Sequence, residues 1–378
     1  MDNSKVWLRR SLLKWWDLNG RHHIPWKKSF SKCDFGTDAL LDPYPIWIAE
    51  VMLQQTQLSV MLPYWERWMF SFPTLDALAE SALDQVLYQW QGLGYYARAR
   101  RLHKAAKQLV GAPLPRSVDQ WMALPGIGRT TAGSIVSSAF NDPEPILDGN
   151  VKRVLARLYA FPSPPSRDLK LFWQWSEALL DPLRPRDFNQ ALMDLGATIC
   201  IPRNPACGGC PWRSCCAAYA FGDPVRWPKT DNQKVLQVEM IGIGVVTNSA
   251  GEVLIDQRLQ EGVLGGMWEF PGGKQEPGES IEACIARELK EELDIAVTVG
   301  EQLVRVDHAF SHKKLCLLVH MCDWVSGDPQ PLASQKVRWV RPEALKNYPF
   351  PAANSRIIEV LLGKLADSGQ AQGSCDAA

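Results

Sequence analysis

No apolar run in this chain approaches the roughly 18 residues that a membrane-spanning helix needs. The first residues, MDNSKVWLRR, also lack the uninterrupted apolar stretch of a secretory signal, so we expect a cytoplasmic protein. The net charge of zero hides an asymmetry, because residues 1–230 carry 27 Lys and Arg against 20 Asp and Glu. Residues 231–378 carry 14 against 21. The basic part favours a polyanionic partner, whereas the acidic part could bind metal or simply be well solvated.

Ten cysteines without a secretion signal do not indicate a disulfide framework. Four of them share one loop with the spacing C-x6-C-x2-C-x5-C: Cys200, Cys207, Cys210 and Cys216. Four thiolates in one intracellular loop indicate a metal site. Structural zinc usually takes two close pairs of cysteines, and only Cys207 and Cys210 form one here, which favours a [4Fe–4S] cluster over zinc. Cys215 could replace Cys216 as a ligand, although the x5 spacing favours Cys216.

The pattern of apolar residues changes near residue 220, from segments of helical length to short segments typical of strands. Before that point, segments of helical length and composition alternate with Pro and Gly, and 13 of the 16 Trp residues favour an aromatic-rich helical core. After a polar stretch, FGDPVRWPKTDNQK, short β-branched segments have the composition of strands, with one helix, SIEACIARELKEEL, among them. We therefore predict a multidomain fold in which an all-α domain is joined to an α/β domain. The predicted boundaries are 1–222 for the helical domain, 223–236 for a linker, 237–365 for the α/β domain and 366–378 for a disordered tail.

A tight turn, Leu124-Pro125-Gly126-Ile127-Gly128, leads into a helix rich in small residues. Gly126 and Gly128 permit backbone angles that other residues resist, and they let a phosphate come close. Exposed N–H groups at the start of that helix would hold the phosphate. The pattern indicates a helix–hairpin–helix element that binds DNA, and the alternative is an ordinary turn between two helices. Four basic residues are also predicted to contact phosphates, with a solvated helix face as the alternative: Arg98, Arg100, Arg101 and Lys104.

Two carboxyl groups have surroundings that suit the cleavage of a glycosidic bond. Asp148 opens the predicted helix VKRVLARLYAF, whose N–H groups should lower the pKa of Asp148 and keep it ionised to face a positively charged sugar. The alternative is that Asp148 caps the helix and does nothing more. Glu50 has apolar neighbours on both sides, which should raise its pKa and let it act as a general acid, although a solvated helix face is the alternative. Two acids with pKa values pushed apart are what glycosidic cleavage needs.

Residues 273–295, GKQEPGESIEACIARELKEELDI, fit the Nudix box, G-x5-E-x7-R-E-U-x-E-E-x-G-U with U aliphatic, except that Asp294 stands where Gly is usual. Glu288, Glu291 and Glu292 are spaced so that they share one helix face. Carboxylates that close repel one another unless a divalent cation lies among them, and this donor set suits Mg²⁺ bound to a diphosphate. The alternative is a solvated acidic helix.

Five segments resemble the MutY branch of the endonuclease III superfamily, and the cysteine spacing fits that branch too. The segments are EVMLQQTQ (50–57), GLGYYARAR (92–100), LPGIGRTTAG (124–133), PILDGNVKRVLARLYA (145–160) and MDLGATIC (193–200). The resemblance covers nearly all of residues 5–222. It implies a monomeric adenine DNA glycosylase of base excision repair, with a [4Fe–4S] cluster, in the nucleoid of a bacterial cytoplasm. Its substrate would be double-stranded DNA with adenine opposite 8-oxoguanine or guanine, and the adenine would be flipped out of the duplex into a pocket.

The same resemblance implies roles for individual residues. Glu50 would protonate adenine N7, and Asp148 would stabilise the oxocarbenium-like sugar or bond to it transiently. Asn150 would help to order Asp148. The residues that the resemblance places against the duplex or its lesion are Gln54, Gln55 and Tyr95.

Thr130 stands where bifunctional relatives carry a nucleophilic Lys. Because a hydroxyl cannot form a Schiff base, we expect a monofunctional glycosylase with little or no lyase activity. The chain departs from the family at two places. Thr130 also replaces a Tyr that helps to hold the catalytic Asp in some relatives, and the segment between Trp26 and Tyr44 is longer than the usual connection, for which we expect a surface loop.

The α/β domain carries two resemblances. Phe310-Ser311-His312 resembles the loop by which MutY C-terminal domains recognise 8-oxoguanine. WEFPGGK (268–274), Arg258 and Pro351-Ala352-Ala353-Asn354 instead resemble MutT-type 8-oxo-dGTP hydrolases. The second likeness implies that Asn354 recognises the oxidised purine and that Mg²⁺ is held by Gly272, Glu288, Glu291 and Glu292. Residues 333–336 lack the acid that such hydrolases often carry there, which favours a domain that only recognises 8-oxoguanine over one that also hydrolyses 8-oxo-dGTP to 8-oxo-dGMP and pyrophosphate.

Overall fold

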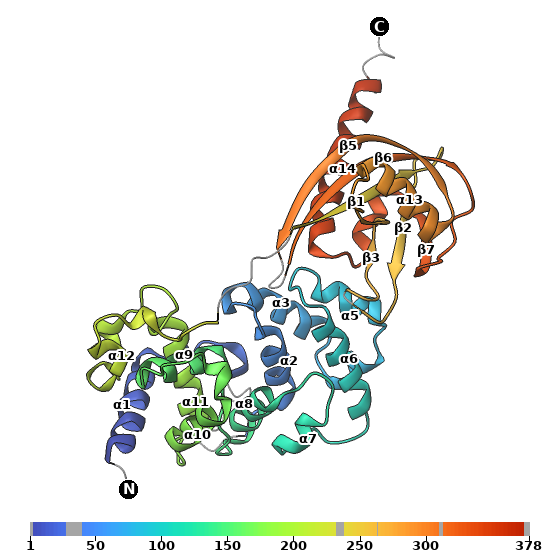
Figure 1. Cartoon of the computed structure of the whole chain (residues 1–378). Helices are drawn as coiled ribbons and strands as arrows, with labels where there is room; N and C mark the ends of the chain where they lie inside the picture. The colour runs from blue at the N-terminus through green and yellow to red at the C-terminus, as the bar shows by residue number, and fades with distance from the viewer. Residues whose placement is uncertain (1–2, 28–39, 232–237, 263, 310–312, 374–378) are drawn as a thin grey trace. The chain divides into compact units, whose positions relative to one another are not determined.

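The computed structural model in Figure 1 describes residues 3–27, 40–231, 238–262, 264–309 and 313–373. It divides into two compact units, one made of residues 1–79 and 104–233 and the other of residues 80–103 and 234–378. The last change of unit falls inside the predicted linker, 223–236. Residues 80–103, which the sequence analysis places in the helical domain, belong to the second unit instead. Hydrogen bonds from Tyr96 to the Phe350 carbonyl and from Arg100 to the Gly262 carbonyl join this segment to the rest of that unit.

Up to the predicted linker, the described chain is helical, as the sequence predicts. Its helices are α1 (Asn3–Asn19), α2 (Pro43–Leu53), α3 (Leu58–Ser71), α4 (Leu75–Glu80), α5 (Leu83–Trp90), α6 (Ala97–Leu109), α7 (Val118–Met122), α8 (Arg129–Phe140), α9 (Gly149–Leu158), α10 (Leu169–Leu179), α11 (Pro185–Asp194) and α12 (Ala217–Ala220). Short 3₁₀ turns lie at Pro25–Lys27, Pro165–Arg167, Cys207–Gly209, Arg213–Cys215 and Pro224–Arg226, and a π turn at Leu195–Ile199 follows α11. Apolar side chains of α1, α9, α10 and α11 form one buried core. None of the described helices combines the length and apolarity needed to cross a bilayer.

Helices α2 and α8 pack against each other. Asp42 caps α2, because its carboxylate accepts a hydrogen bond of 2.9 Å from the Tyr44 backbone N–H. Most of α2 is buried, which explains its apolar composition. Helix α8 is rich in small residues, and a Cβ at Gly133 would lie 2.7 Å from the Pro145 carbonyl oxygen. The chain that leads to α9 therefore passes directly against α8.

The second unit contains a mixed sheet between two helices. Its strands are β1 (Val238–Thr247), β2 (Val253–Arg258), β3 (Trp268–Glu269), β4 (Gly272–Lys274), β5 (Ala296–Ala309), β6 (Lys314–Ser326) and β7 (Ser334–Val340). They follow the order β3-β2-β1-β6-β5, with β4 also paired to β1 and β7 to β2. Strands β1 and β6 run parallel and the other pairs antiparallel. Helix α13 (Ile281–Leu293) packs on one face, α14 (Ala352–Gly373) packs on the other, and a 3₁₀ helix spans Pro342–Asn347.

The end of the chain differs from the prediction. We predict a disordered tail at 366–378, but α14 continues through Gly373, and residues 374–378 lie outside the described part. Ile357 and Leu361 are fully buried in the core of the second unit. A helix nucleated by such packing is extended at little further cost, which accounts for the added turns.

Candidate active site

Glu50 lies near the end of α2 and is only partly exposed. Burial, and to a lesser extent the charge of Asp148, raise the pKa of its carboxyl to about 7, although Ser134 and Lys27 act in the opposite direction. The direction is the one that the apolar sequence around Glu50 predicts. Because the charge of Asp148 acts on Glu50, the two candidate acids share one site, which the sequence alone could not show.

Asp148 is the N-cap of α9, as its position in the sequence predicts. Its Oδ1 accepts a hydrogen bond of 2.7 Å from the Val151 backbone N–H, and its Oδ2 accepts one of 3.3 Å from Asn150 Nδ2. The predicted fall in its pKa is wrong, because burial raises the pKa of Asp148 by more than the bonds to Val151 and Asn150 and the charge of Arg153 lower it. The error came from counting the helix N–H groups without the loss of water around a half-buried carboxyl.

Asn150 is held between Asp148 and an arginine that the sequence analysis does not single out. Arg153 donates hydrogen bonds of 2.7 Å to Asn150 Oδ1, 2.6 Å to the Gly196 carbonyl and 2.7 Å to the Cys200 carbonyl. The signal that could have found it is spacing, since residues three apart on a helix are neighbours. Arg153 therefore fixes the amide that touches the candidate catalytic carboxylate.

Replacing Gly196 with Ala should slow excision by roughly tenfold, because a Cβ there would lie 2.7 Å from the Asn150 Cβ and would displace the amide from Asp148. Overpacking of a buried site should also cost about 1–3 kcal/mol of unfolding free energy. Single-turnover kinetics and thermal melts measure the two effects. Gly149→Ala is the matched control, since nothing lies within 4 Å of a Cβ at that position. Equal rates for Gly196→Ala and Gly149→Ala would contradict this account of the site.

Lys27 is a second residue that sequence reasoning missed. It lies next to the acids, because its charge acts on Glu50, and its Nζ is 3.5 Å from Asp194 Oδ1. Burial lowers the pKa of Lys27 to about 8, although the charge of Asp194 opposes this shift. The sequence offered no signal, since a lysine beside a long polar segment resembles any solvated lysine. The predicted surface loop that follows lies mostly outside the described residues, at 28–39.

Two of the three residues predicted to contact the duplex or its lesion occupy strained backbone positions. Gln55 and Tyr95 have φ values of +61° and +49°, in the left-handed region that most side chains avoid. Tyr95 is 47% exposed, and Gln54 donates a hydrogen bond of 3.2 Å to Thr131 Oγ1. An exposed aromatic side chain on a strained turn suits insertion between bases.

The hairpin glycines differ from each other. Gly126 has a φ of +82°, as predicted, but Gly128 has an extended φ of −97° and is the N-cap of α8. Gly128 is therefore not needed for an unusual backbone angle, and that part of the prediction is wrong. Nothing lies within 4 Å of a Cβ at Gly128, so the space in front of the α8 N-terminus is open. That geometry fits the approach of a phosphate.

Two of the four predicted phosphate contacts serve the protein itself. Arg98 is buried and donates hydrogen bonds of 3.1 Å to the carbonyls of Leu93 and Gly94. Arg100 donates to the carbonyls of Gly262 and Gly265 within the second unit. Both guanidinium groups already have partners within the protein, which disfavours the predicted phosphate contacts at these two residues. Arg101 and Lys104 are exposed, so their prediction stands.

The four cysteines with metal-ligand spacing lie around the 3₁₀ turns that follow α11. The pKa values of Cys207, Cys210 and Cys216 are all raised, first by burial and then in part by the charge of Cys200, so the thiols interact electrostatically. Cys215 interacts in this way with Cys216 alone. Within the described ranges, no three His, Cys, Asp or Glu side chains are arranged to hold a metal ion. The donor set nevertheless has the chemistry of a thiolate-ligated site.

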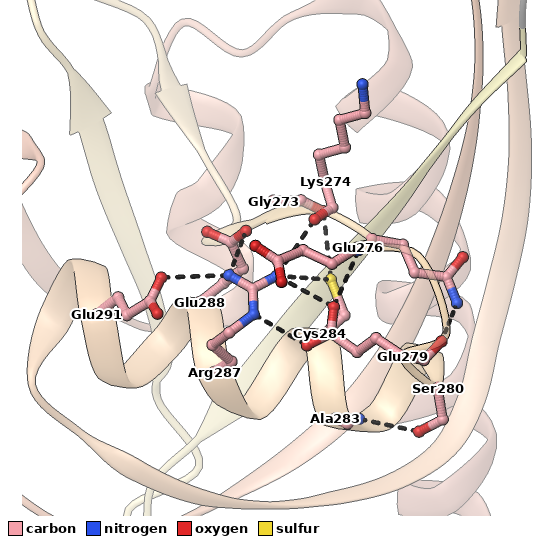
Figure 2. Close-up of polar contacts among 11 residues, drawn as sticks. Gly273, Lys274, Glu276, Glu279, Ser280, Ala283, Cys284, Arg287, Glu288 and Glu291 are labelled. Carbon is pink, nitrogen blue, oxygen red and sulfur yellow. Dashed lines mark hydrogen bonds and ion pairs between the residues drawn. The ribbon is translucent and has the colours of Figure 1, made fainter.

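In the second unit, the predicted Nudix box forms β4, the following loop and α13 (Figure 2). Arg287 lies at its centre, with its guanidinium nitrogens 2.9 Å from Glu279, 3.0 Å from Glu288 and 3.2 Å from Glu291. Arg287 and a backbone N–H lower the pKa of Glu279 to about 2. Gly272 has a φ of +147°, and a Cβ there would lie 2.1 Å from the Gly242 carbonyl oxygen, so only glycine fits.

The three predicted Mg²⁺ carboxylates have different surroundings. Glu288 and Glu291 form ion pairs with Arg287. By contrast, burial and the charges of Glu288 and Glu269 raise the pKa of Glu292 to about 7. The described part of the second unit does not gather three of them in an arrangement suited to a metal. Asn354 is buried at the start of α14, where its backbone N–H bonds to the Pro351 carbonyl at 2.9 Å. Ser311 and His312 lie outside the described residues.

Two protein families match this chain. Residues 48–176 match the family described as "HhH-GPD superfamily base excision DNA repair protein", and residues 242–360 match the family described as "NUDIX domain". The chain is 33% identical to the adenine DNA glycosylase of Rattus norvegicus, over 93% of this chain and 77% of the relative. It is 32% identical to the adenine DNA glycosylase of Homo sapiens, over 97% and 75%. A thermostable thymine-DNA glycosylase, 24% identical with a TM-score of 0.51 over 58% of this chain and 98% of its own, shares the fold of the helical part.

Proposed function

Because this chain belongs to the adenine DNA glycosylase family, we propose that it excises adenine opposite 8-oxoguanine or guanine. It is a DNA N-glycosylase of base excision repair, with a helix–hairpin–helix domain and a Nudix domain. The observation that carries the proposal is the pairing of Glu50 and Asp148, two acids whose charges interact at one partly buried site. Cleavage of a glycosidic bond needs one acid that is protonated and one that is ionised.

Glu50 acts as the general acid. With a pKa of about 7, its carboxyl is about half protonated at neutral pH, and it donates this proton to N7 of the flipped adenine. Protonation of the base weakens the N-glycosidic bond, whose electron pair leaves with the adenine. A positive charge then develops on the deoxyribose.

Asp148 stabilises that positive charge, and it is the ionised form that does so. The Val151 N–H and the Asn150 amide donate to its two oxygens and orient the carboxylate. Water attacks the sugar and loses a proton to Glu50, which completes the hydrolysis and restores both groups. Thr130 has no amine to form a Schiff base with the abasic sugar, so the strand stays intact.

The test uses the whole chain and a duplex with adenine opposite 8-oxoguanine. Free adenine should be released, and the strand should break only after alkali treatment. A duplex with cytosine opposite 8-oxoguanine is the control and should stay unchanged. Absence of adenine release would refute the proposed substrate, and a borohydride-trapped adduct would refute the monofunctional mechanism.

We also propose that Cys200, Cys207, Cys210 and Cys216 hold a [4Fe–4S] cluster. The donor set supports it, as do the electrostatic interactions of the four thiols. Bound there, the cluster would act as a structural cross-link of the loop and would take no part in the hydrolysis. The loop is also tied to α9, because Arg157 donates hydrogen bonds of 2.7 Å to the Ile201 carbonyl and 2.9 Å to the Pro202 carbonyl.

Adjacent cysteines provide a matched test of the ligand set. Cys216→Ser should lose iron and acid-labile sulfide and lower the melting temperature, because one of four ligands is removed. Cys215→Ser should keep both, since Cys215 is exposed and interacts with Cys216 alone. The measurements are iron and sulfide per chain, and a thermal melt. Equal losses from both variants would contradict the assignment of Cys216.

For the second unit we propose recognition of 8-oxoguanine in the duplex. The Nudix family match supports this role, together with the resemblance of residues 310–312 to a lesion-recognition loop. Mg²⁺ binding and hydrolysis of 8-oxo-dGTP have no specific observation in their favour, because Glu288 and Glu291 pair with Arg287 and the described residues gather no three carboxylates in an arrangement suited to a metal. We therefore leave them as predictions from the sequence.

A further inference from the structure

The first turn of α8 carries two adjacent threonines that contact different parts of the first unit. Thr130 Oγ1 donates a hydrogen bond of 3.1 Å to the Leu147 carbonyl. Thr131 Oγ1 accepts one of 3.2 Å from Gln54 Nε2. The threonines are the second and third residues after the Gly128 N-cap, so they belong to the same turn as the open N-terminus that fits a phosphate.

The Thr130 bond fixes the peptide that leads into Asp148. Leu147 is buried, and its carbonyl belongs to the peptide plane that joins it to Asp148. Upstream, the contact of Pro145 with Gly133 presses the same segment against α8. The direction in which the Asp148 side chain leaves the backbone therefore depends on the hydroxyl at position 130. A direct bond to the carboxylate is not needed for this effect.

The Thr131 bond acts on the turn that ends α2. Gln54 is the C-cap of α2, and the next residue, Gln55, has the left-handed φ of +61°. Thr131 is buried, so its hydroxyl is a fixed partner for the Gln54 amide. An anchored amide holds the side chain and the strained turn in one conformation before DNA arrives, which lowers the ordering cost of binding.

We propose that Thr130 and Thr131 are positioning residues that couple the phosphate-binding hairpin to two separate tasks. Thr130 seats the catalytic Asp148, and Thr131 seats Gln54 for its contact with the duplex. A DNA phosphate held at the start of α8 would fix the one turn on which both hydroxyl groups lie. The inference rests on the proposed function, since it assumes that Asp148 and Gln54 act in adenine excision.

The test removes each hydroxyl separately, in the variants Thr130→Val and Thr131→Val. Thr130→Val should lower the single-turnover rate at saturating enzyme by about 3- to 10-fold, the range expected for the loss of one hydrogen bond. Thr131→Val should raise Kd for a duplex that carries a non-cleavable adenosine analogue opposite 8-oxoguanine by a similar factor. Its main loss of rate should appear below saturation. The control is Thr247→Val, whose hydroxyl donates to the Cys322 carbonyl in the second unit, and it should change neither quantity.

Serine at each position restores a hydroxyl and should restore the wild-type value, which a loss of folding would not allow. The inference is overturned if both valine variants match the wild type. It is also overturned if both lower the rate and the affinity together with the melting temperature, without rescue by serine. No adenine release by the wild type would contradict the proposed function itself. Equal rates for the wild type and Thr130→Val would contradict only the role of Thr130.

Discussion

Replacing Glu50 with Gln should slow adenine excision by roughly 100- to 10,000-fold, the usual contribution of a general acid. Glutamine keeps the shape of the side chain but cannot release a proton to the base. The measurement is the single-turnover rate on a duplex with adenine opposite 8-oxoguanine, with enzyme in excess. A rate within threefold of the wild type would show that another group protonates the adenine.

The pH profile separates loss of the acid from general damage. A carboxyl with a pKa of about 7 is protonated below that pH, so the wild-type rate should fall by about tenfold per pH unit above about 7. The residual rate of Glu50→Gln should lack this limb, because glutamine does not titrate. On the acid side, the rate should fall as Asp148 is protonated, at a pH above the ordinary range of an aspartate because its pKa is raised. An alkaline limb that survives in Glu50→Gln would assign it to another group.

The same variant should be more stable than the wild type at alkaline pH. The folded protein binds a proton at Glu50 up to about pH 7, whereas the unfolded chain releases it near the ordinary value of 4.5. The stability of the wild type should therefore fall as the pH rises from about 4.5 to 7, by no more than about 3 kcal/mol. Glu50→Gln avoids this loss, so the variant remains folded while it is inactive. Melts at pH 5 and pH 8 compare the two proteins.

Replacing Asp148 with Asn should slow excision by roughly three orders of magnitude, because the negative charge that faces the developing sugar cation is lost. The amide oxygen of asparagine can still accept the Val151 N–H that now bonds to Asp148 at 2.7 Å. The cap of α9 is thus retained, but the NH₂ group of the new amide cannot accept the bond from Asn150, so the melting temperature should fall slightly. Single-turnover kinetics again provide the measurement. A rate above one tenth of the wild-type value would show that the carboxylate charge is not needed.

Asp168→Asn is the matched control for Asp148→Asn. Asp168 caps α10 in the same unit, where its Oδ1 accepts a hydrogen bond of 3.1 Å from the Leu171 N–H. Both variants change an N-cap aspartate into asparagine, but only one removes a charge from the candidate site. Asp148→Asn should also lower the pKa of Glu50, because the Asp148 charge helps to raise it, and this would move the alkaline limb to lower pH.

The local features of the site could be predicted from the sequence. Apolar neighbours predict the raised pKa of Glu50, and the position of Asp148 before a helix predicts its capping bonds. The balance of opposing effects could not be predicted, since burial outweighs the N–H donors at Asp148 only in the folded chain. Nor does any local pattern bring α2 and α9 to one site, because that contact is a product of tertiary packing.

The basic residues show why composition alone is a poor guide to DNA contacts. Arg98, Arg100, Arg101 and Lys104 share one helix and have the same charge, so the sequence treats them alike. In the fold, Arg98 and Arg100 donate hydrogen bonds to backbone carbonyls, whereas Arg101 and Lys104 are exposed. A carbonyl that needs a donor leaves no trace in the local sequence when it lies far along the chain, as the Gly262 carbonyl does for Arg100.

The division of the chain into two units limits which fragments of the protein can be expressed with all their contacts. The second unit is discontinuous in sequence, because residues 80–103 are inserted in the helical part of the chain yet belong with residues 234–378. A fragment that ends in the linker would lack the Phe350 and Gly262 carbonyls, which accept hydrogen bonds from the Tyr96 and Arg100 side chains. The loop that carries Tyr95 would keep the bonds from Arg98 to the Leu93 and Gly94 carbonyls but would lose these two long-range bonds. Domain boundaries drawn at the linker alone therefore define a fragment in which the segment 80–103 lacks its bonds to the residues beyond the linker.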